Sequence, residues 1–147
     1  MANVRQLDFS KPADSDLLWD AITEKGASVL SLNGKVAHTL LYTATTYEFL
    51  VELETVFVVG PYLVAYAVHT PWYSDEEVLC DLIVMRLNDD PGSLSDVTNF
   101  LEDEARRLDV RWVAVGTLLA PQDQSLVRAY QRQGYEVAAT QLVKEIT

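Results

Sequence analysis

The sequence has few of the residues that build disulfides and metal sites. Its 147 residues contain one cysteine and two histidines. Cys80 therefore has no partner for an internal disulfide or a cysteine-based metal cage, and we expect a small buried residue on a strand. His38 and His69 stand alone, without a second histidine at the spacing of a zinc-binding helix. No metal site is expected.

Long apolar runs and basic residues are also scarce. The amino end lacks a basic segment followed by an apolar run, and no stretch approaches the roughly 18 apolar residues of a membrane span. Eleven Lys and Arg face 22 Asp and Glu, which gives a net charge of −11. This charge repels a phosphate backbone. We expect a soluble protein of the cytoplasmic type that binds neither nucleic acid nor membranes.

The chain does contain enough apolar residues for a core. Hydrophobic residues make up 49% of the sequence and charged residues 22%, which is close to an average globular protein. A length of 147 residues suits one core rather than two. We therefore expect a single domain, residues 1–147.

The first third of the chain gives mixed signals. A short strand is predicted at 4–7, followed by a helix that ends at Gly26. Residues 27–54 combine a turn signal, β-branched residues and partial helical spacing, and we favour a helix over 36–47.

The pattern becomes clearer from Thr55. Two apolar runs, 55–59 and 62–68, flank Gly60-Pro61 and predict a β-hairpin, and 78–87 predicts a third strand. The remaining elements alternate between helix and strand. They are a helix capped by Ser93 or Ser95, a buried strand at 111–119, a short helix at 125–133 closed by Gly134, and a last strand at 135–146. The prediction is an α/β chain with a central mixed sheet flanked by helices.

The segment Tyr130-Gln-Arg-Gln-Gly134-Tyr135 resembles the closing segment of GNAT-type N-acetyltransferases, in which a helix carrying Tyr-x-x-x-Gly-Phe leads into the final strand. The resemblance covers about 55–146 and implies a βαβαβ core over about 79–146. It also implies that the strand at about 78–87 splays from its neighbour and opens an acyl-CoA cleft.

The same resemblance assigns roles to two residues. Tyr130 would protonate the departing thiolate, and Asp81 would take the proton of the acceptor amine. The alternative for Tyr130 is an amphipathic side chain that packs its helix on the sheet. The alternative for Asp81 is a carboxylate on a solvent-facing strand position.

The loop after the splayed strand departs from the family. Family members use Gln/Arg-x-x-Gly-x-Gly/Ala there, so that backbone N–H groups can approach the diphosphate. In Arg86-Leu-Asn-Asp-Asp-Pro-Gly-Ser93 only Arg86 matches cleanly, and Pro91 lacks an N–H. Ten carboxylates and one cation lie between 74 and 104, a net charge of −9. Asp123 stands where the family often has asparagine. If the cofactor bound, the contacts implied are Met85, Arg86, Leu87, Gly92, Ser93 and Asp123.

Two hypotheses follow. The favoured one is a catalytically degenerate GNAT-like domain that serves as a structural or protein-interaction module without a cofactor. It looks like the small GNAT-like proteins of tailed bacteriophages, some of which are packaged in the virion. Its partners would be other proteins or further copies of the chain. The alternative is an active acetyl-CoA-dependent N-acetyltransferase that acts on a cationic amine.

Three aromatic residues are candidates for a contact surface in the favoured hypothesis. Trp72, Tyr73 and Tyr62 are of the type enriched at interface anchors. Trp72 follows a proline at a strand end, so capping of the core is an equal alternative. The open edge of the splayed strand could also receive a strand from a partner or another copy.

Overall fold

The structure is a computed structural model that describes residues 2–24, 43–116, 124–139 and 146. Helical residues 12–24 follow the first strand. The other elements are β1 (Val4–Gln6), α2 (Thr43–Leu53), β2 (Val56–Val59), β3 (Tyr62–His69), β4 (Val78–Arg86), α3 (Leu94–Arg107), β5 (Trp112–Ala114) and α4 (Gln124–Arg132). The prediction of a mixed α and β chain is confirmed for the described residues.

The sheet has five strands in the order β1-β2-β3-β4-β5. The first four pair antiparallel, and β5 pairs parallel to β4 after the α3 crossover. Val59 pairs with Tyr62, so β2 and β3 are joined by the two-residue turn Gly60-Pro61. Gly60 has φ +56°, a left-handed conformation that glycine adopts without a Cβ clash. The predicted hairpin is therefore confirmed.

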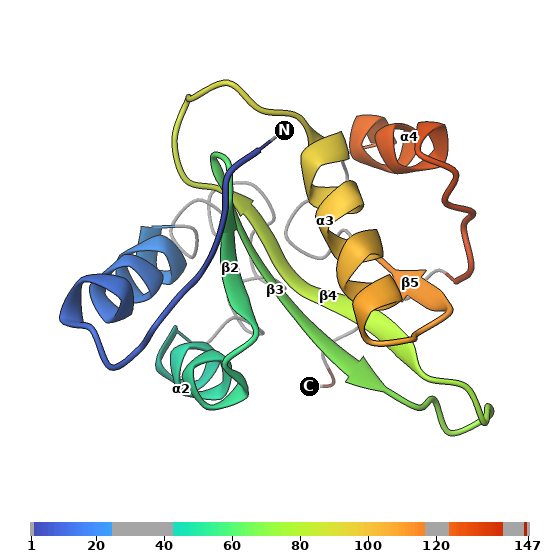
Figure 1. Cartoon of the computed structure of the whole chain (residues 1–147), viewed down its shortest axis with the longest axis horizontal. Coiled ribbons are helices and arrows are strands. Elements are labelled where there is room, and N and C mark those ends of the chain that lie inside the picture. Colours follow the sequence, from blue (N-terminus) through green and yellow to red (C-terminus); the bar gives the residue numbers. More distant parts are fainter. Residues whose placement is uncertain (1, 25–42, 117–123, 140–145, 147) are drawn as a thin grey trace.

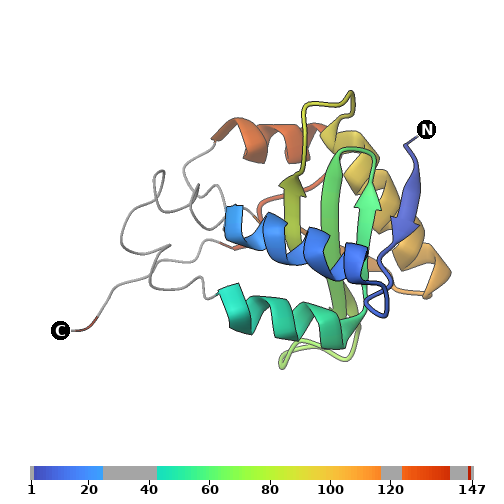
Figure 2. The same ribbon diagram turned by 90° about the vertical axis from the view of Figure 1, so that its left-hand side faces the viewer.

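Helices cover both faces of the sheet (Figures 1 and 2). Alternation along β3 sends Leu63 and Ala65 into one apolar cluster, and Val64 and Tyr66 into the other. The first cluster packs against residues 12–24 and α2. The second packs against α3, whose Val97, Phe100, Leu101 and Ala105 form the predicted buried face. The sheet is thus held between two apolar layers.

Three of the predicted elements differ from the structure. The helix placed at 36–47 is wrong in its limits, because α2 covers Thr43–Leu53 and 36–42 lie outside the described residues. The segment mixes helical and strand residue types, so burial against the sheet decides its limits. The strand predicted at 111–119 is short, and Trp112 on it is exposed. Of the last strand predicted at 135–146, the structure describes residues 135–139 and 146. None of these described residues is in a strand.

No helix in the described ranges is long and apolar enough to cross a membrane.

Candidate functional site

Asp81 lies where β4 and β5 separate. The parallel pairing joins residues 78–80 to 112–114, and no pair beyond Cys80 follows within the described residues. One residue further, Asp81 Oδ1 accepts the backbone N–H of Gly116 at 3.0 Å. A side-chain carboxylate thus receives an N–H group of the chain leaving β5. Within the described residues, the pairing of β4 with β5 thus ends at Cys80.

A β-bulge lies next to this carboxylate. On β3, Ala65 pairs with Ile83 but the next residue, Tyr66, pairs with Asp81, so Leu82 is an extra residue on β4. Bulges bend a strand and increase its twist, and they are frequent beside functional sites. The bulge explains why β4 stops following β5 at this point.

The Asp81 carboxyl is half-buried, and burial raises its pKa from 3.8 to about 6. The hydrogen bond from Gly116 acts in the opposite direction and is the weaker influence. A carboxyl group with this pKa is mostly ionised at neutral pH and is still basic enough to accept a proton. The position is therefore suited to proton transfer, and the solvent-facing alternative for Asp81 holds only in part.

Tyr130 comes from α4 and is 4% exposed. Its ring meets that of Tyr135 edge-on, with centroids 5.8 Å apart. Burial raises the pKa of the Tyr130 phenol above its ordinary value, and the negative charge of Asp81 acts in the same direction. The alternative role of Tyr130, packing its helix, is equally compatible with its burial.

The helix that carries Tyr130 ends as the sequence predicts. Gly134 has φ +94°, and the N–H groups of Gln133 and Tyr135 both donate to Tyr130 O. This left-handed glycine terminates α4 and turns the chain so that Tyr135 returns to the ring of Tyr130. The Tyr-x-x-x-Gly segment thus sets the orientation of the tyrosine.

Arg86 closes the loop that follows β4. Its guanidinium donates to three backbone carbonyls of the loop: Nε to Asn88 O at 3.0 Å, Nη2 to Asp90 O at 2.6 Å and Nη1 to Gly92 O at 3.3 Å. Nη1 also donates to the Tyr62 hydroxyl at 3.0 Å, and the guanidinium lies 5.2 Å from the centre of that ring. The carbonyls of the loop therefore point inward at a cation.

Several N–H groups of the same loop are also engaged inside the protein. Pro91 has none to offer. Three of these N–H groups donate to protein acceptors. Leu87 N–H donates to Pro61 O at 2.7 Å, Asp90 N–H to Asn88 Oδ1 at 3.0 Å, and Ser93 N–H to Asp96 Oδ2 at 3.1 Å. Ser93 is the N-cap of α3, as predicted, and a carboxylate now occupies the position that an anion takes at an open helix N-terminus.

The other predicted cofactor contacts serve the fold. Met85 is buried in the first apolar cluster, and Leu87 packs against it. A Cβ at Gly92 would lie 2.5 Å from Pro61 Cδ, so this glycine allows the loop to pack on the β2–β3 turn. Asp123 lies outside the described residues. In the described part of the loop, three N–H groups have protein acceptors and three carbonyls accept from Arg86.

The predicted charge of −9 is not concentrated at the loop. Glu104 pairs with Arg107 at 2.8 Å, Asp103 pairs with Arg106 at 2.9 Å, and Glu76 pairs with Arg111. All three arginines lie after residue 104, outside the counted segment. The α3 pairs form because residues three apart on a helix are neighbours. Asp89 and Asp90 are exposed and carry the negative charge of the loop itself.

The three predicted contact aromatics do not form one surface. Trp72 and Tyr73 follow the end of β3 and are exposed, whereas Tyr62 begins β3 and is held by Arg86. A rise of about 3.3 Å per residue puts roughly 25 Å of strand between the two ends. Tyr62 is therefore part of the loop structure, and the capping alternative for Trp72 is wrong because its ring is free of the core.

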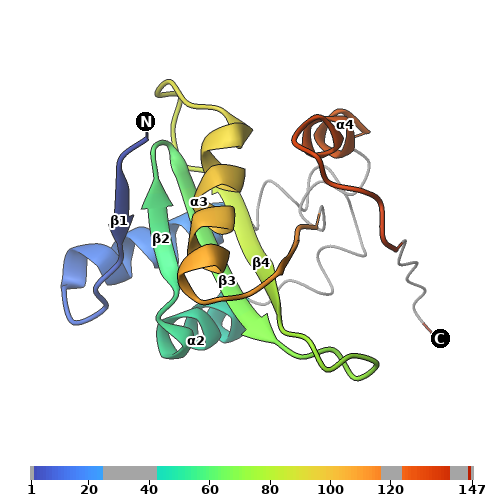
Figure 3. The same ribbon diagram turned by 45° about the vertical axis from the view of Figure 1, so that its right-hand side comes forward.

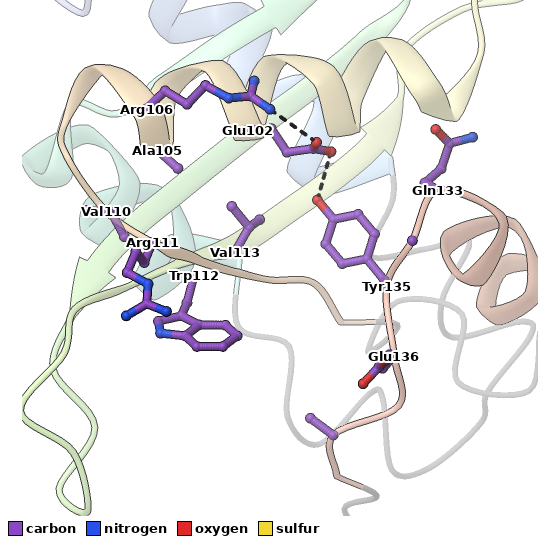
Figure 4. A pocket seen from close by; sticks show the side chains of 12 residues that line it. Glu102, Ala105, Arg106, Val110, Arg111, Trp112, Val113, Gln133, Tyr135 and Glu136 are labelled. Carbon is purple, nitrogen blue, oxygen red and sulfur yellow. Dashed lines mark hydrogen bonds and ion pairs between the residues drawn. The ribbon is translucent and has the colours of Figure 1, made fainter.

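A groove lies beside β5 and is lined in part by residues of the predicted last strand (Figure 4). Its walls are α3, β5 and the segment after α4. The Tyr135 hydroxyl donates to Glu102 Oε2 at 3.3 Å, and Arg106 Nη2 lies 3.9 Å from Glu102 Oε1, so this contact joins the segment to α3. Sequence reasoning missed the contact between Tyr135 and Glu102, and it missed the hydrogen bond from Gly116 to Asp81. The available signal for Gly116 was its position shortly after an apolar run.

Within the described residues, no three His, Cys, Asp or Glu side chains are grouped as a metal ion would require. Comparison of the chain with models of known protein families, with curated proteins and with solved structures finds no match. The function must therefore be argued from the strands, loop and side chains themselves.

Proposed function

We propose that this chain is a GNAT-like domain that does not use coenzyme A and acts as a protein-interaction module, with assembly into a virion as one setting. Support for the family comes from the separation of β4 from β5 and from α4, which carries Tyr130 and ends at Gly134. Support for the loss of cofactor use comes from the loop between β4 and α3.

The single observation that carries the proposal is the closure of this loop on Arg86. Carbonyl oxygens, not N–H groups, converge on its centre, and the cation there has several protein acceptors. A diphosphate would need the reverse arrangement, with N–H donors facing an open slot. Opening the loop would break the hydrogen bonds that Arg86 makes to three of its carbonyls.

Electrostatics act in the same direction. A carboxylate about 5 Å from a phosphate charge costs roughly 3 kcal/mol at an effective dielectric constant near 20. The favourable dipole of a helix N-terminus returns only about 0.3–2 kcal/mol, and at α3 the Asp96 carboxylate already receives the Ser93 N–H. Asp89 and Asp90 therefore add repulsion that the loop does not offset.

Isothermal titration of the chain with acetyl-CoA tests the proposal. We expect no binding heat at low ionic strength, where electrostatic effects are largest. Micromolar binding would overturn it. The variant D89N/D90N separates the two causes: the geometric cause alone predicts that it also fails to bind, whereas charge alone predicts that it binds.

A second candidate, an N-acetyltransferase acting on a cationic amine, is favoured by the half-buried Asp81 carboxyl, whose pKa burial raises to about 6, and by the buried Tyr130 phenol. In that case the ionised Asp81 accepts a proton and the neutral Tyr130 phenol donates one. Thiol release from acetyl-CoA over a panel of polyamines and aminoglycosides tests this candidate, and Y130F is the matched variant. Turnover that Y130F abolishes would support the enzyme, and no turnover with any amine would reject it.

A further inference from the structure

The connection between β3 and β4, residues 70–77, projects beyond the end of the sheet (Figures 1 and 3). We call it the aromatic tip. Trp72 is 95% exposed and Tyr73 is 75% exposed, with their rings edge-on and 5.5 Å apart. No other large apolar side chain of the described residues is as exposed as Trp72. A side chain of this size normally buries about 150–250 Å² of surface.

The backbone of the tip is held in place. Ser74 N–H donates to Pro71 O at 3.0 Å, and Glu76 N–H donates to Ser74 Oγ at 3.0 Å. The Glu76 carboxylate accepts from Arg111 at 3.0 Å and from the Trp112 indole N–H, so the tip is tied to β5 and the residue before it. A ligand would therefore meet a loop whose backbone is already ordered.

The charge of the tip is of one sign. Residues 70–77 contain three carboxylates and no Lys or Arg. Glu76 is paired with Arg111, whereas Asp75 and Glu77 are exposed and make no ion pair with another described residue. Aromatic faces beside free carboxylates favour a guanidinium or ammonium group, which stacks on the ring and pairs with the acid.

We infer that the aromatic tip binds an arginine- or lysine-rich segment of a partner protein. This names the partner class of the proposed interaction role and rests on it. A second copy of the chain is a poorer occupant, because two chains that each carry a net charge of −11 repel one another. A partner segment of net positive charge is attracted instead.

A binding measurement tests the inference. The probe is a short fluorescent peptide of alternating arginine and glycine, and a peptide with glutamate in place of arginine is the control ligand. We expect the cationic peptide alone to bind. The variants W72A/Y73A and D75N/E77Q should each weaken binding at least about tenfold, because they remove the stacking faces or the paired charges.

The matched controls lie on α2, where Phe49 is 55% exposed and Glu48 and Glu52 are also exposed. F49A and E48Q/E52Q should leave binding unchanged at about physiological salt. Equal weakening by E48Q/E52Q and D75N/E77Q would reject the tip and assign the binding to the net charge. Unchanged binding by W72A/Y73A would reject it too. Self-association that W72A/Y73A abolishes would instead assign the tip to a second copy.

Failure of the inference and failure of the proposed function are distinguishable. Acetyl-CoA binding by the wild type, with tip-dependent peptide binding retained, would reject the cofactor-independent role and keep the tip assignment. Absence of tip-dependent binding, without acetyl-CoA binding, would reject the tip assignment alone.

Discussion

Replacing Asp81 by asparagine should stabilise the protein at neutral pH. The variant keeps the size of the side chain and an Oδ1 that can accept the Gly116 N–H, and it removes the half-buried negative charge. Burial raises the Asp81 pKa from 3.8 to about 6, so the charged form is disfavoured in the folded state. At 1.36 kcal/mol per pKa unit, the cost of that charge is at most about 3 kcal/mol.

The pH dependence of this effect has a definite sign. With the folded pKa raised, the folded state binds more protons than the unfolded state between about pH 4 and pH 6, so stability falls as pH rises through that window. Below it, Asp81 is neutral in both states and the variant should match the wild type. Above it, D81N should be more stable, by up to about 3 kcal/mol.

Urea denaturation followed by circular dichroism, in steps from about pH 4 to pH 8, measures the difference in the free energy of unfolding between the two proteins. The exposed loop substitution D89N is the control and should change stability little at any pH. A D81N protein that is less stable than the wild type at pH 8, or a difference that does not vary with pH, would refute the reasoning.

Three further substitutions test other parts of the structure by the same unfolding measurement. Y66F removes a hydroxyl that donates to Glu104 Oε1 at 2.8 Å, and should cost about 1–3 kcal/mol; no loss would mean that the buried bond adds nothing. G92A places a Cβ 2.5 Å from Pro61 Cδ and should cost about 1–3 kcal/mol, so an unchanged stability would contradict the close packing. D14N removes a buried carboxylate, and the hydrogen bond from Asp8 N–H is the largest cause that lowers its pKa. The substitution should therefore destabilise the protein at pH 7 by about 1.5–3 kcal/mol. That difference should shrink as pH falls below about 4, and a constant difference would argue against the charge.

The parts of the fold that sequence predicted well are those set by local signals. Gly60-Pro61 dictates a tight turn, Ser93 begins α3, and Gly134 ends α4. The errors fall where tertiary packing decides. The helix predicted at 36–47 continues to Leu53, because Leu50 packs into the core between helix and sheet.

The catalytic roles of Asp81 and Tyr130 came from the family resemblance and stay predictions. The structure adds the hydrogen bond from Gly116 to Asp81 and the burial of Tyr130. Closure of the loop by Arg86 was not predicted, because the direction of its guanidinium depends on the backbone conformation of the loop and on Tyr62, a residue 24 positions earlier in the chain. Sequence reasoning based the expected loss of phosphate binding on charge and missing glycines; the structure adds the hydrogen bonds within the loop to these arguments.

The account depends most on the state of the loop from Leu87 to Leu94, and its backbone amides can be observed directly. Amide nitrogen–proton NMR spectra recorded during titration with coenzyme A should show no shift of the signals of this loop, because its carbonyls stay on Arg86 and several N–H groups keep their protein acceptors. Saturable shifts confined to these amides, with release of the Arg86 guanidinium signal, would contradict the account.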